Sequence, residues 1–313
     1  MDFNFNLNLN STQKSLLKEI ADLSNVPDGA FNIRSNSQSI GRQSAQNIQI
    51  VSKTDVSGMD IFIKPNTKNE SVHIPVIITE SGIKEEVYND FFVGDNADVE
   101  IVAGCGIDNC GNHDSQHDGI HRFYIGKNAH VRYVEKHYGS GEGEGKRILN
   151  PVTEVYMEEN SSAEMEMVQI KGVDDTTRTT IAKLKDGAKL VVRERLMTHN
   201  DQKAISVYDV SLDGKDSSAD IVSRAVASGN SYQKFEAKIV GNAPCKGHTE
   251  CDSIIMDNGK ILAVPALEAN NVDASLVHEA AIGKIAGEQI VKLMTLGLTE
   301  SQAEEQIING FLR

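Results

Sequence analysis

The 313-residue sequence has no tryptophan, only 5% aromatic residues, four cysteines and no long apolar run. Its longest apolar stretches, such as residues 74–78, are far shorter than the ~20 residues that a membrane-spanning helix needs, so we expect no membrane insertion. The first residues, Met-Asp-Phe-Asn, lack the basic and continuous apolar regions of a secretory signal. Four cysteines in so long a chain do not indicate a disulfide scaffold, and we expect reduced thiols in the cytoplasm.

Basic residues are also scarce, and the net charge is −14. An acidic surface repels phosphate backbones, which argues against nucleic acid as a partner. The glycine-rich stretch 140–147 is not a phosphate-binding loop, because Ser140 replaces the first required glycine and Arg147 replaces the magnesium-binding Ser or Thr. There is no Gly-x-Ser-x-Gly or His-Glu-x-x-His motif either. We therefore expect any nucleotide chemistry to lie on another chain.

A short helix is predicted near the N-terminus. Residues 1–10 alternate Phe or Leu with Asn, a pattern that suits a loose edge strand or a disordered tail. Residues 12–24 have apolar residues at helical spacing, and Ser11 or Thr12 is placed to cap their start. Pro27 and the Asp-Gly pair after it are expected to end this helix.

A weak repeat runs through the middle of the chain. Between residues 31 and 265, helical periodicity is almost absent, and short alternating runs are broken by Gly, Asn, Asp and Ser. Five segments share a polar turn, an alanine and alternating apolar positions; the alanines are residues 97, 129, 163, 188 and 219, at steps of 32, 34, 25 and 31. A period of this size predicts stacked units that each bury one face against the next, as in a β-solenoid. A two-sheet antiparallel sandwich is the alternative.

Two helices are predicted at the C-terminus. Apolar residues recur at helical spacing from Ile282 to Met294, Gly297 ends that helix, and Thr299 caps the next one with Gln302 in the reciprocal position. The second helix is acidic, which argues against DNA binding and favours docking of another protein. We therefore divide the chain into an N-terminal segment with a short helix (1–30), a β-helix core (31–270) and a C-terminal helical subdomain (271–313).

Candidate metal ligands occur near the C-terminus. Cys251 lies between Glu250 and Asp252, and two acids raise the pKa of a thiol, so metal binding is a better route to a thiolate than free nucleophilicity. His278 and Glu279 form an adjacent imidazole–carboxylate pair. The alternatives are a buried cysteine that packs as a small apolar residue and a hydrogen-bonded core histidine.

A second cluster offers more ligands than chance predicts. Its spacing is Cys-x4-Cys-x2-His-x3-His-x3-His, and zinc binds up to four such side chains. The surrounding Gly and Asp residues predict a loop, and the spacing matches no zinc finger, so an incidental cluster is the alternative. A β-solenoid metalloenzyme or zinc-binding protein would use this loop. Its candidate ligands are Cys105, Cys110, His113, His117 and His121.

The C-terminal third of the sequence resembles the SufB/SufD family of iron–sulfur cluster assembly proteins. Residues 119–126 and 146–151 resemble more loosely the short, stand-alone members of that family. The segments that carry the main resemblance are Gly-His-Thr-Glu-Cys-Asp-Ser (247–253), Pro-Ala-Leu-Glu (265–268), His-Glu-Ala-Ala-Ile-Gly-Lys-Ile (278–285), Leu-Met-Thr-Leu-Gly-Leu (293–298) and Ile-Ile-Asn-Gly-Phe (307–311).

The resemblance implies a mainly β protein: a right-handed parallel β-helix with a short N-terminal helix and a helical C-terminal end. It implies a non-enzymatic assembly scaffold, a transient iron–sulfur cluster, a SufC-type ABC ATPase at the C-terminal helices and a cysteine desulfurase as sulfur source. Cys251, His278 and Glu279 are the site residues that it implies, and their joint presence is similar to the SufB side of the family.

Two further expectations follow from the resemblance. A symmetric homodimer is expected to bring Cys251 of one copy close to His278 and Glu279 of the other, since the family's site lies where two subunits meet. Met157 stands where long SufB members carry a sulfur-accepting cysteine, so the route of sulfur to Cys251 stays open.

Overall fold

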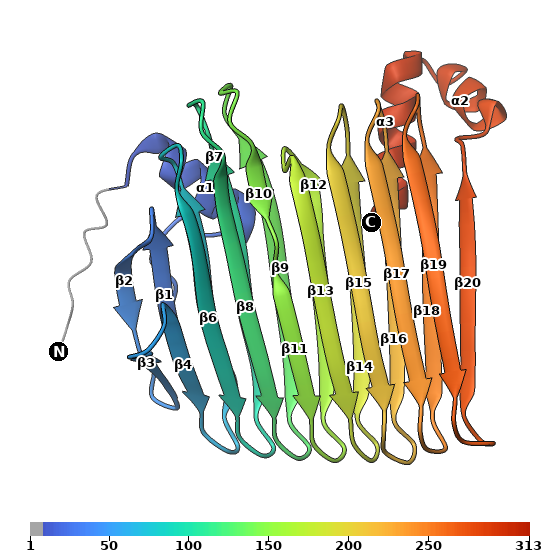
Figure 1. The fold of residues 1–313 in the computed structure, drawn as a ribbon. Helices are drawn as coiled ribbons and strands as arrows, with labels where there is room; N and C mark the ends of the chain where they lie inside the picture. Colours follow the sequence, from blue (N-terminus) through green and yellow to red (C-terminus); the bar gives the residue numbers. More distant parts are fainter. Residues whose placement is uncertain (1–8) are drawn as a thin grey trace.

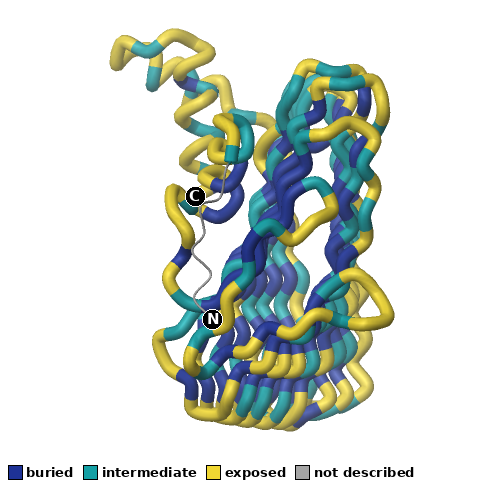
Figure 2. The backbone as a smooth tube through the Cα atoms, turned by 90° about the vertical axis from the view of Figure 1, so that its left-hand side faces the viewer, coloured by how far each residue is buried: buried dark blue, intermediate teal, exposed yellow. Residues whose placement is uncertain are grey.

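The computed structural model describes residues 9–313 and shows a β-solenoid of about eight turns (Figure 1). Its strands form two ten-stranded sheets, and each turn of the chain contributes to both. Seen along the solenoid, the sheets stand as two walls that are joined by exposed turns and enclose the buried residues (Figure 2). The predicted mainly β solenoid is therefore confirmed.

The strands of the first sheet, in spatial order, are β2 (Gln38–Gln43), β1 (Ala30–Ser35), β5 (Lys68–Ile78), β7 (Asp98–Asp108), β9 (His130–Ser140), β12 (Ser162–Lys171), β14 (Lys189–Thr198), β16 (Ser218–Ala227), β18 (Lys246–Ile255) and β20 (Ser275–Gly283). Those of the second sheet are β3 (Ile48–Ser52), β4 (Gly58–Ile63), β6 (Lys84–Val93), β8 (Ser115–Ile125), β10 (Arg147–Leu149) with β11 (Val152–Met157), β13 (Asp175–Leu184), β15 (Lys203–Leu212), β17 (Tyr232–Gly241) and β19 (Lys260–Ala269).

Neighbouring turns pair in parallel, which excludes the antiparallel sandwich. Only β1 with β2 and β3 with β4, near the N-terminal end, pair antiparallel among the described strands. In the first sheet the registered positions are 98, 130, 162, 189, 218, 246 and 275. The true steps are therefore 32, 32, 27, 29, 28 and 29 residues, more regular than the spacing of the alanines predicted.

Small residues form a continuous row at the start of these strands. The five alanines of the predicted repeat are all buried, but residues 163 and 219 lie two positions further along their strands than the other three. A small side chain is needed here because successive turns stack directly on one another. The row consists of Ala97, Ala129, Ser161, Ala188, Ser217, Cys245 and Ala274. Cys245 is therefore a packing residue.

Asparagines stack in the turn that precedes this row. Asn96, Asn128 and Asn160 have φ values of 57°, 56° and 56°, a left-handed conformation that asparagine tolerates better than most residues. The Asn128 amide donates to the Asn96 side-chain oxygen at 3.3 Å, so neighbouring turns are also linked through side chains.

The predicted N-terminal helix is present as α1 (Ser11–Ala21). Its cap is Asn10, with Gln13 as reciprocal partner, and not Ser11 or Thr12 as predicted. The helix ends at Ala21, before Pro27, because Asp22 takes a left-handed conformation. Most of the strand-like pattern in residues 1–10 lies outside the described residues. Helix α1 packs on the outer face of the first sheet.

The C-terminal end contains one more strand than the sequence predicted. Residues assigned to the start of the penultimate helix, including Ile282, belong to β20, and α2 (Gly287–Met294) begins only afterwards. Gly297 and the Thr299–Gln302 capping box occur as predicted, followed by α3 (Glu300–Phe311). No helix among residues 9–313 is long and apolar enough to cross a membrane.

The solenoid ends without a covering element at β19 and β20, here called the open end. These strands are last in their sheets, so within the described chain one edge of each has no strand partner. Large apolar side chains are 40–45% exposed there: Leu262, Leu267, Val277 and Ile282. An uncovered edge of this kind is prone to pair with another chain.

Candidate functional site

The interior of the solenoid is apolar along half of each strand and polar along the other half. In β9, Val131 and Tyr133 face the interior beside apolar residues, whereas Glu135 and His137 further along face buried polar groups. The strands of the second sheet run the opposite way, so Arg178 near the start of β13 meets these groups. The polar half lies on the side away from the row of small residues.

A buried ion pair anchors this polar half. Arg178 donates to Glu135, and Glu135 lies 3.5 Å from His137 Nε2. Burial favours protonation of Glu135, but the positive charge of Arg178 outweighs it and holds the pKa of that carboxyl well below its usual range. Two strands further along the sheet, at the registered position of β14, Glu194 accepts hydrogen bonds from Ser206 and Ser223, both at 2.6 Å.

Cys251 lies at the end of this polar row. The register places Glu194 beside Ser223 and Ser223 beside Cys251 on adjacent strands. Cys251 is 1% exposed, and its sulfur lies 3.6 Å from the Ser253 hydroxyl. Burial, with smaller contributions from Glu194 and Asp252, raises the pKa of the thiol to about 11. The thiol is therefore protonated at neutral pH unless a metal ion displaces the proton.

His278 shares the inner face with Cys251. The sequence assigned it to the C-terminal helical subdomain, but it lies on β20, where it pairs with Thr249 of β18. Its Nδ1 is 2.6 Å from the Thr249 hydroxyl. Cys251 and His278 are thus diagonal neighbours on one face, with Cα atoms roughly 8 Å apart from the spacing of strands and residues. One chain by itself thus brings Cys251 and His278 onto adjacent strands, and a site shared between two copies stays a prediction.

Glu279 faces the other way. Because side chains alternate along a strand, it lies on the outer face, paired with Glu250. Its Oε2 is 3.9 Å from His248 Nε2, and potential ligand atoms of His248, Glu250 and Glu279 all lie within 4.8 Å of one another. The predicted trio of Cys251, His278 and Glu279 is therefore divided between the two faces of the sheet.

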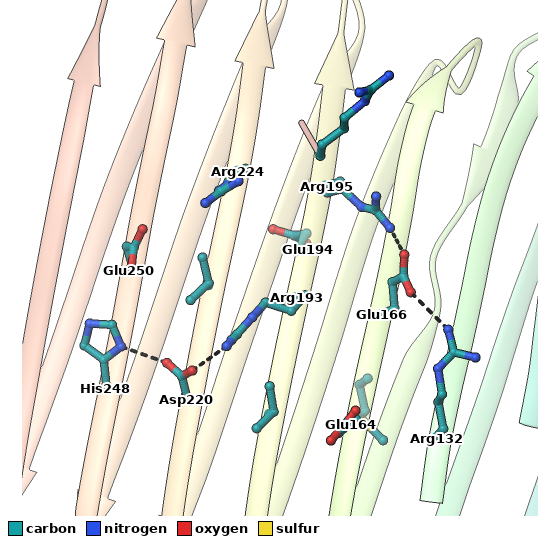
Figure 3. A pocket seen from close by; sticks show the side chains of 14 residues that line it. Arg132, Glu164, Glu166, Arg193, Glu194, Arg195, Asp220, Arg224, His248 and Glu250 are labelled. Carbon is teal, nitrogen blue, oxygen red and sulfur yellow. Dashed lines mark hydrogen bonds and ion pairs between the residues drawn. The ribbon is translucent and has the colours of Figure 1, made fainter. Parts of the chain in front are cut away.

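Sequence reasoning missed His248 and Glu250 as partners of Glu279. Residues at i and i+2 of a strand share a face, but their proximity to Glu279 depends on pairing with β20. Figure 3 shows His248 joined to Arg193 through Asp220. These residues line an open groove of about 880 Å³ on the outer face of the first sheet.

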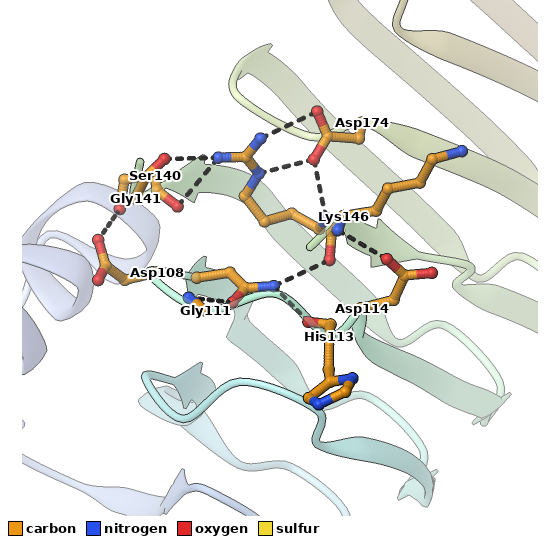
Figure 4. A network of polar contacts seen from close by, with 10 residues as sticks. Asp108, Gly111, His113, Asp114, Ser140, Gly141, Lys146 and Asp174 are labelled. Atoms are coloured by element: carbon orange, nitrogen blue, oxygen red, sulfur yellow. Dashed lines mark hydrogen bonds and ion pairs between the residues drawn. The ribbon is translucent and has the colours of Figure 1, made fainter. Parts of the chain in front are cut away.

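The cluster predicted in a single loop is separated in the structure. Cys110 is exposed, and His113 is held through its backbone oxygen by the Asn109 amide at 2.8 Å. Figure 4 shows the His113 imidazole pointing away from that polar network. Cys105 lies on β7, and His117 and His121 lie on β8, all three buried and facing the interior. The predicted loop is therefore wrong for Cys105, His117 and His121, which lie on strands. Metal binding by members of this cluster stays a prediction.

Comparisons with known proteins agree on one family. Residues 88–311 match the family model described as the SufBD core domain of SUF-system iron–sulfur cluster assembly. Similar curated proteins are SufBD family proteins of Methanothermobacter thermautotrophicus (27% identical over 82% of this chain and 63% of that protein) and Archaeoglobus fulgidus (30%, 82% and 69%). One from Pyrococcus horikoshii is 28% identical over 90% of this chain and 86% of its own length. The match spans less than two thirds of the Methanothermobacter relative.

The burial of the thiols leads to a testable order of reactivity. A thiol-modifying reagent at neutral pH is expected to label Cys110 rapidly and the buried Cys105, Cys245 and Cys251 slowly. For Cys251, a pKa of about 11 instead of 9.0 lowers the thiolate fraction roughly a hundredfold, before access is considered. Mass spectrometry of the labelled native protein measures this. Cys110→Ser should remove the fast phase and Cys251→Ser should keep it; a fast phase that depends on Cys251 would contradict the burial.

Proposed function

Because the chain belongs to the SufB/SufD family, we propose that it is a scaffold on which an iron–sulfur cluster is assembled and then released, and not an enzyme acting on small molecules. The observation that carries this proposal is the position of Cys251 and His278 together on the inner face of β18 and β20, at the open end. Thiolate sulfur and imidazole nitrogen are both ligands that suit iron.

The chemistry of Cys251 suits temporary holding of a cluster. Iron binds the thiolate, so binding must release the thiol proton. Since burial raises the thiol pKa to about 11, a proton competes strongly with iron for the sulfur. The cluster is the cargo of this site, and its loss returns Cys251 to the neutral thiol that the buried environment favours.

His278 is suited to serve as the nitrogen ligand. Burial, together with the nearby His248, lowers the pKa of its imidazole and favours the neutral form that binds metals. The Thr249 hydroxyl at Nδ1 holds the ring and leaves Nε2 as the available ligand atom. On the outer face, Glu279 with His248 offers a carboxylate–imidazole pair that we assign to initial capture of iron.

Anaerobic reconstitution with ferrous iron and sulfide tests the scaffold. Cys251→Ser is expected to reduce bound iron and acid-labile sulfide at least about tenfold, and His278→Gln to make the remaining cluster more labile. Glu279→Gln is expected to slow loading and leave the final yield largely intact, because Glu279 faces the other side. Iron and sulfide analysis with visible absorption measures the outcome.

Cys110→Ser is the matched control for this experiment, since Cys110 is exposed and lies on a loop far along the chain. A full cluster yield in Cys251→Ser, or equal loss in Cys110→Ser, would exclude Cys251 as the ligand.

We further propose that a second copy of the chain covers the open end. Both last strands have a free edge within the described chain, and the exposed apolar side chains Leu262, Leu267 and Val277 lie on them. A two-fold arrangement pairs identical edges and covers these side chains on both copies at once. It also sets two Cys251–His278 sites near one interface, where ligands from both copies can share a cluster.

A substitution that introduces a charge at the open end tests whether this end forms the homodimer interface. Leu267→Lys places an ammonium group at an apolar position that is 40% exposed, and we expect at least a tenfold weaker self-association. Val51→Lys, at a 38% exposed position on β3 near the other end, serves as the control and should leave the mass unchanged. Sedimentation at several concentrations gives the association constant; a dimer unaffected by Leu267→Lys would place the interface elsewhere.

We also propose that a SufC-type ABC ATPase docks on α2, that a cysteine desulfurase supplies the sulfur and that assembly occurs in the cytoplasm. Helix α2 has no buried residue. Val291 and Met294 on this helix expose 59% and 43% of their surface, and Leu296, in the turn that follows it, exposes 76%. Helix α3 is anchored instead through Ala303 and Leu312, which are buried. An exposed apolar patch of this kind, next to a helix that is packed against the solenoid, is typical of a docking surface for another protein.

Point substitutions on α2 and in the turn that follows it test this docking without disturbing α3. Leu296→Asp with Val291→Asp is expected to weaken co-purification with the ATPase at least tenfold, because the patch would no longer exclude water. Val26→Asp, at a 37% exposed apolar position near the other end, is the control. Retained binding by the folded α2 variant would assign the docking surface to another part of the chain.

A further inference from the structure

Arginines neutralise several acids on the outer face of the first sheet, but not those of its last two strands. The neutralised pairs are Arg132 with Glu100 and Glu166, Arg195 with Glu166, and Arg193 with Asp220. On the last strands, Glu250 of β18 lies directly opposite Glu279 of β20, and Asp252 is the next outward residue of β18. Within residues 9–313, no Lys or Arg forms an ion pair with these three acids. Like charges at paired positions destabilise a sheet, so this place favours a bound cation.

His248 adds an imidazole whose orientation is fixed. It lies on the outer face of β18, two residues before Glu250, and its Nδ1 is 2.8 Å from an Asp220 oxygen (Figure 3). The other Asp220 oxygen accepts from Arg193 at 2.7 Å. A carboxylate that is ion-paired with arginine only accepts hydrogen bonds, so His248 Nδ1 carries a proton and Nε2 is the metal-binding atom. Nε2 lies 3.9 Å from Glu279 Oε2.

These three side chains converge on one place. Potential ligand atoms of His248, Glu250 and Glu279 lie within 4.8 Å of one another, and no other such group of three is found among the described residues. Two atoms that share a first-row metal ion at ~2.1 Å lie about 3–3.5 Å apart. The Glu279 side chain is 67% exposed, so it can rotate inward to close the difference without any movement of β20.

The site is open to the solvent. His248 and Glu250 both line the outer groove of about 880 Å³, so water can occupy the coordination positions that the protein leaves free. One imidazole nitrogen and two carboxylate oxygens suit a ferrous-type divalent ion and not a soft ion that prefers thiolates. With no thiolate among its ligands, such a site binds and releases an ion without the loss of a thiol proton.

We propose that His248 Nε2, Glu250 and Glu279 bind one mononuclear ferrous ion before any sulfide arrives, and that Asp220 positions His248 for this task. A carboxylate hydrogen-bonded to the other nitrogen of a metal-bound histidine commonly has this role. The identity of the ion as iron rests on the proposed scaffold function, whereas the ligand set rests on the geometry alone. The ion is held on the outer face of β18 and β20, whose inner face carries Cys251 and His278.

Anaerobic equilibrium dialysis of the full-length chain with Fe²⁺, in the absence of sulfide, tests this site. We expect one tightly bound Fe²⁺ per chain, and Glu250→Gln, Glu279→Gln and His248→Gln should each weaken its binding at least tenfold. Co²⁺ bound in its place should give visible bands without a thiolate charge-transfer band. Asp220→Asn should weaken binding about tenfold and shift those bands, because His248 loses its charged partner.

Glu164→Gln is the matched control. It removes one carboxylate from the same groove, three strand steps from β18 or roughly 14 Å away, and should bind Fe²⁺ normally. Cys251→Ser should also bind Fe²⁺ normally. Because no sulfide is present, this result is independent of the cluster yield that tests the scaffold.

Three results would overturn the proposal. Glu250→Gln and Glu279→Gln could bind Fe²⁺ like the parent chain, which would remove both carboxylates from the ligand set. Glu164→Gln could weaken binding as much as they do, which would reduce the effect to the general negative charge of the groove. Loss of Fe²⁺ binding in Cys251→Ser would place the ion on the inner face.

Discussion

The parallel register between successive turns is the constraint on which this structure depends. Because side chains alternate along each strand, one residue of slip would exchange the inner and outer faces of a whole turn. Cys251 faces inward and Glu250 outward only because β18 is held in register between β16 and β20. The stacked row of small residues and the left-handed asparagines beside it preserve that register at one end of each turn.

The two sheets of the solenoid enclose its interior and keep water out. Charged groups inside it therefore destabilise the fold unless they are paired. This chain nevertheless places Glu135, Arg178 and Glu194 there, each with hydrogen-bonding partners. The satisfied network gives the interior two different environments. An apolar half holds the sheets together, and a polar half contains buried imidazole, carboxylate and guanidinium groups. The thiols of Cys105 and Cys251 both face this polar half.

The two faces of the first sheet carry different sets of candidate metal ligands at its last strands. Inside, a buried, protonated thiol lies on the same face as a half-buried imidazole whose pKa is lowered by burial. Outside, His248, Glu250 and Glu279 form a partly exposed group of hard and borderline ligands beside a wide groove. Only this single β-sheet separates the inner group of side chains from the outer group. An assembly scaffold benefits from this arrangement, because an exposed site can capture iron while a shielded site holds a cluster.

The sequence alone indicated an approximate period for the stack and favoured a β-solenoid over a sandwich. It also determined the terminal helices with the Thr299 cap and the inventory of candidate ligands, because these follow from local patterns. It also carried the resemblance to the family. Which ligands share a space was decided by the tertiary structure. Residues 27–32 apart become neighbours through backbone pairing, so His278 meets Thr249, Glu279 meets His248, and His117 leaves the loop of Cys110 and His113 for the interior. Spacing within a loop cannot reveal such contacts, because strand direction and register are set by the whole stack.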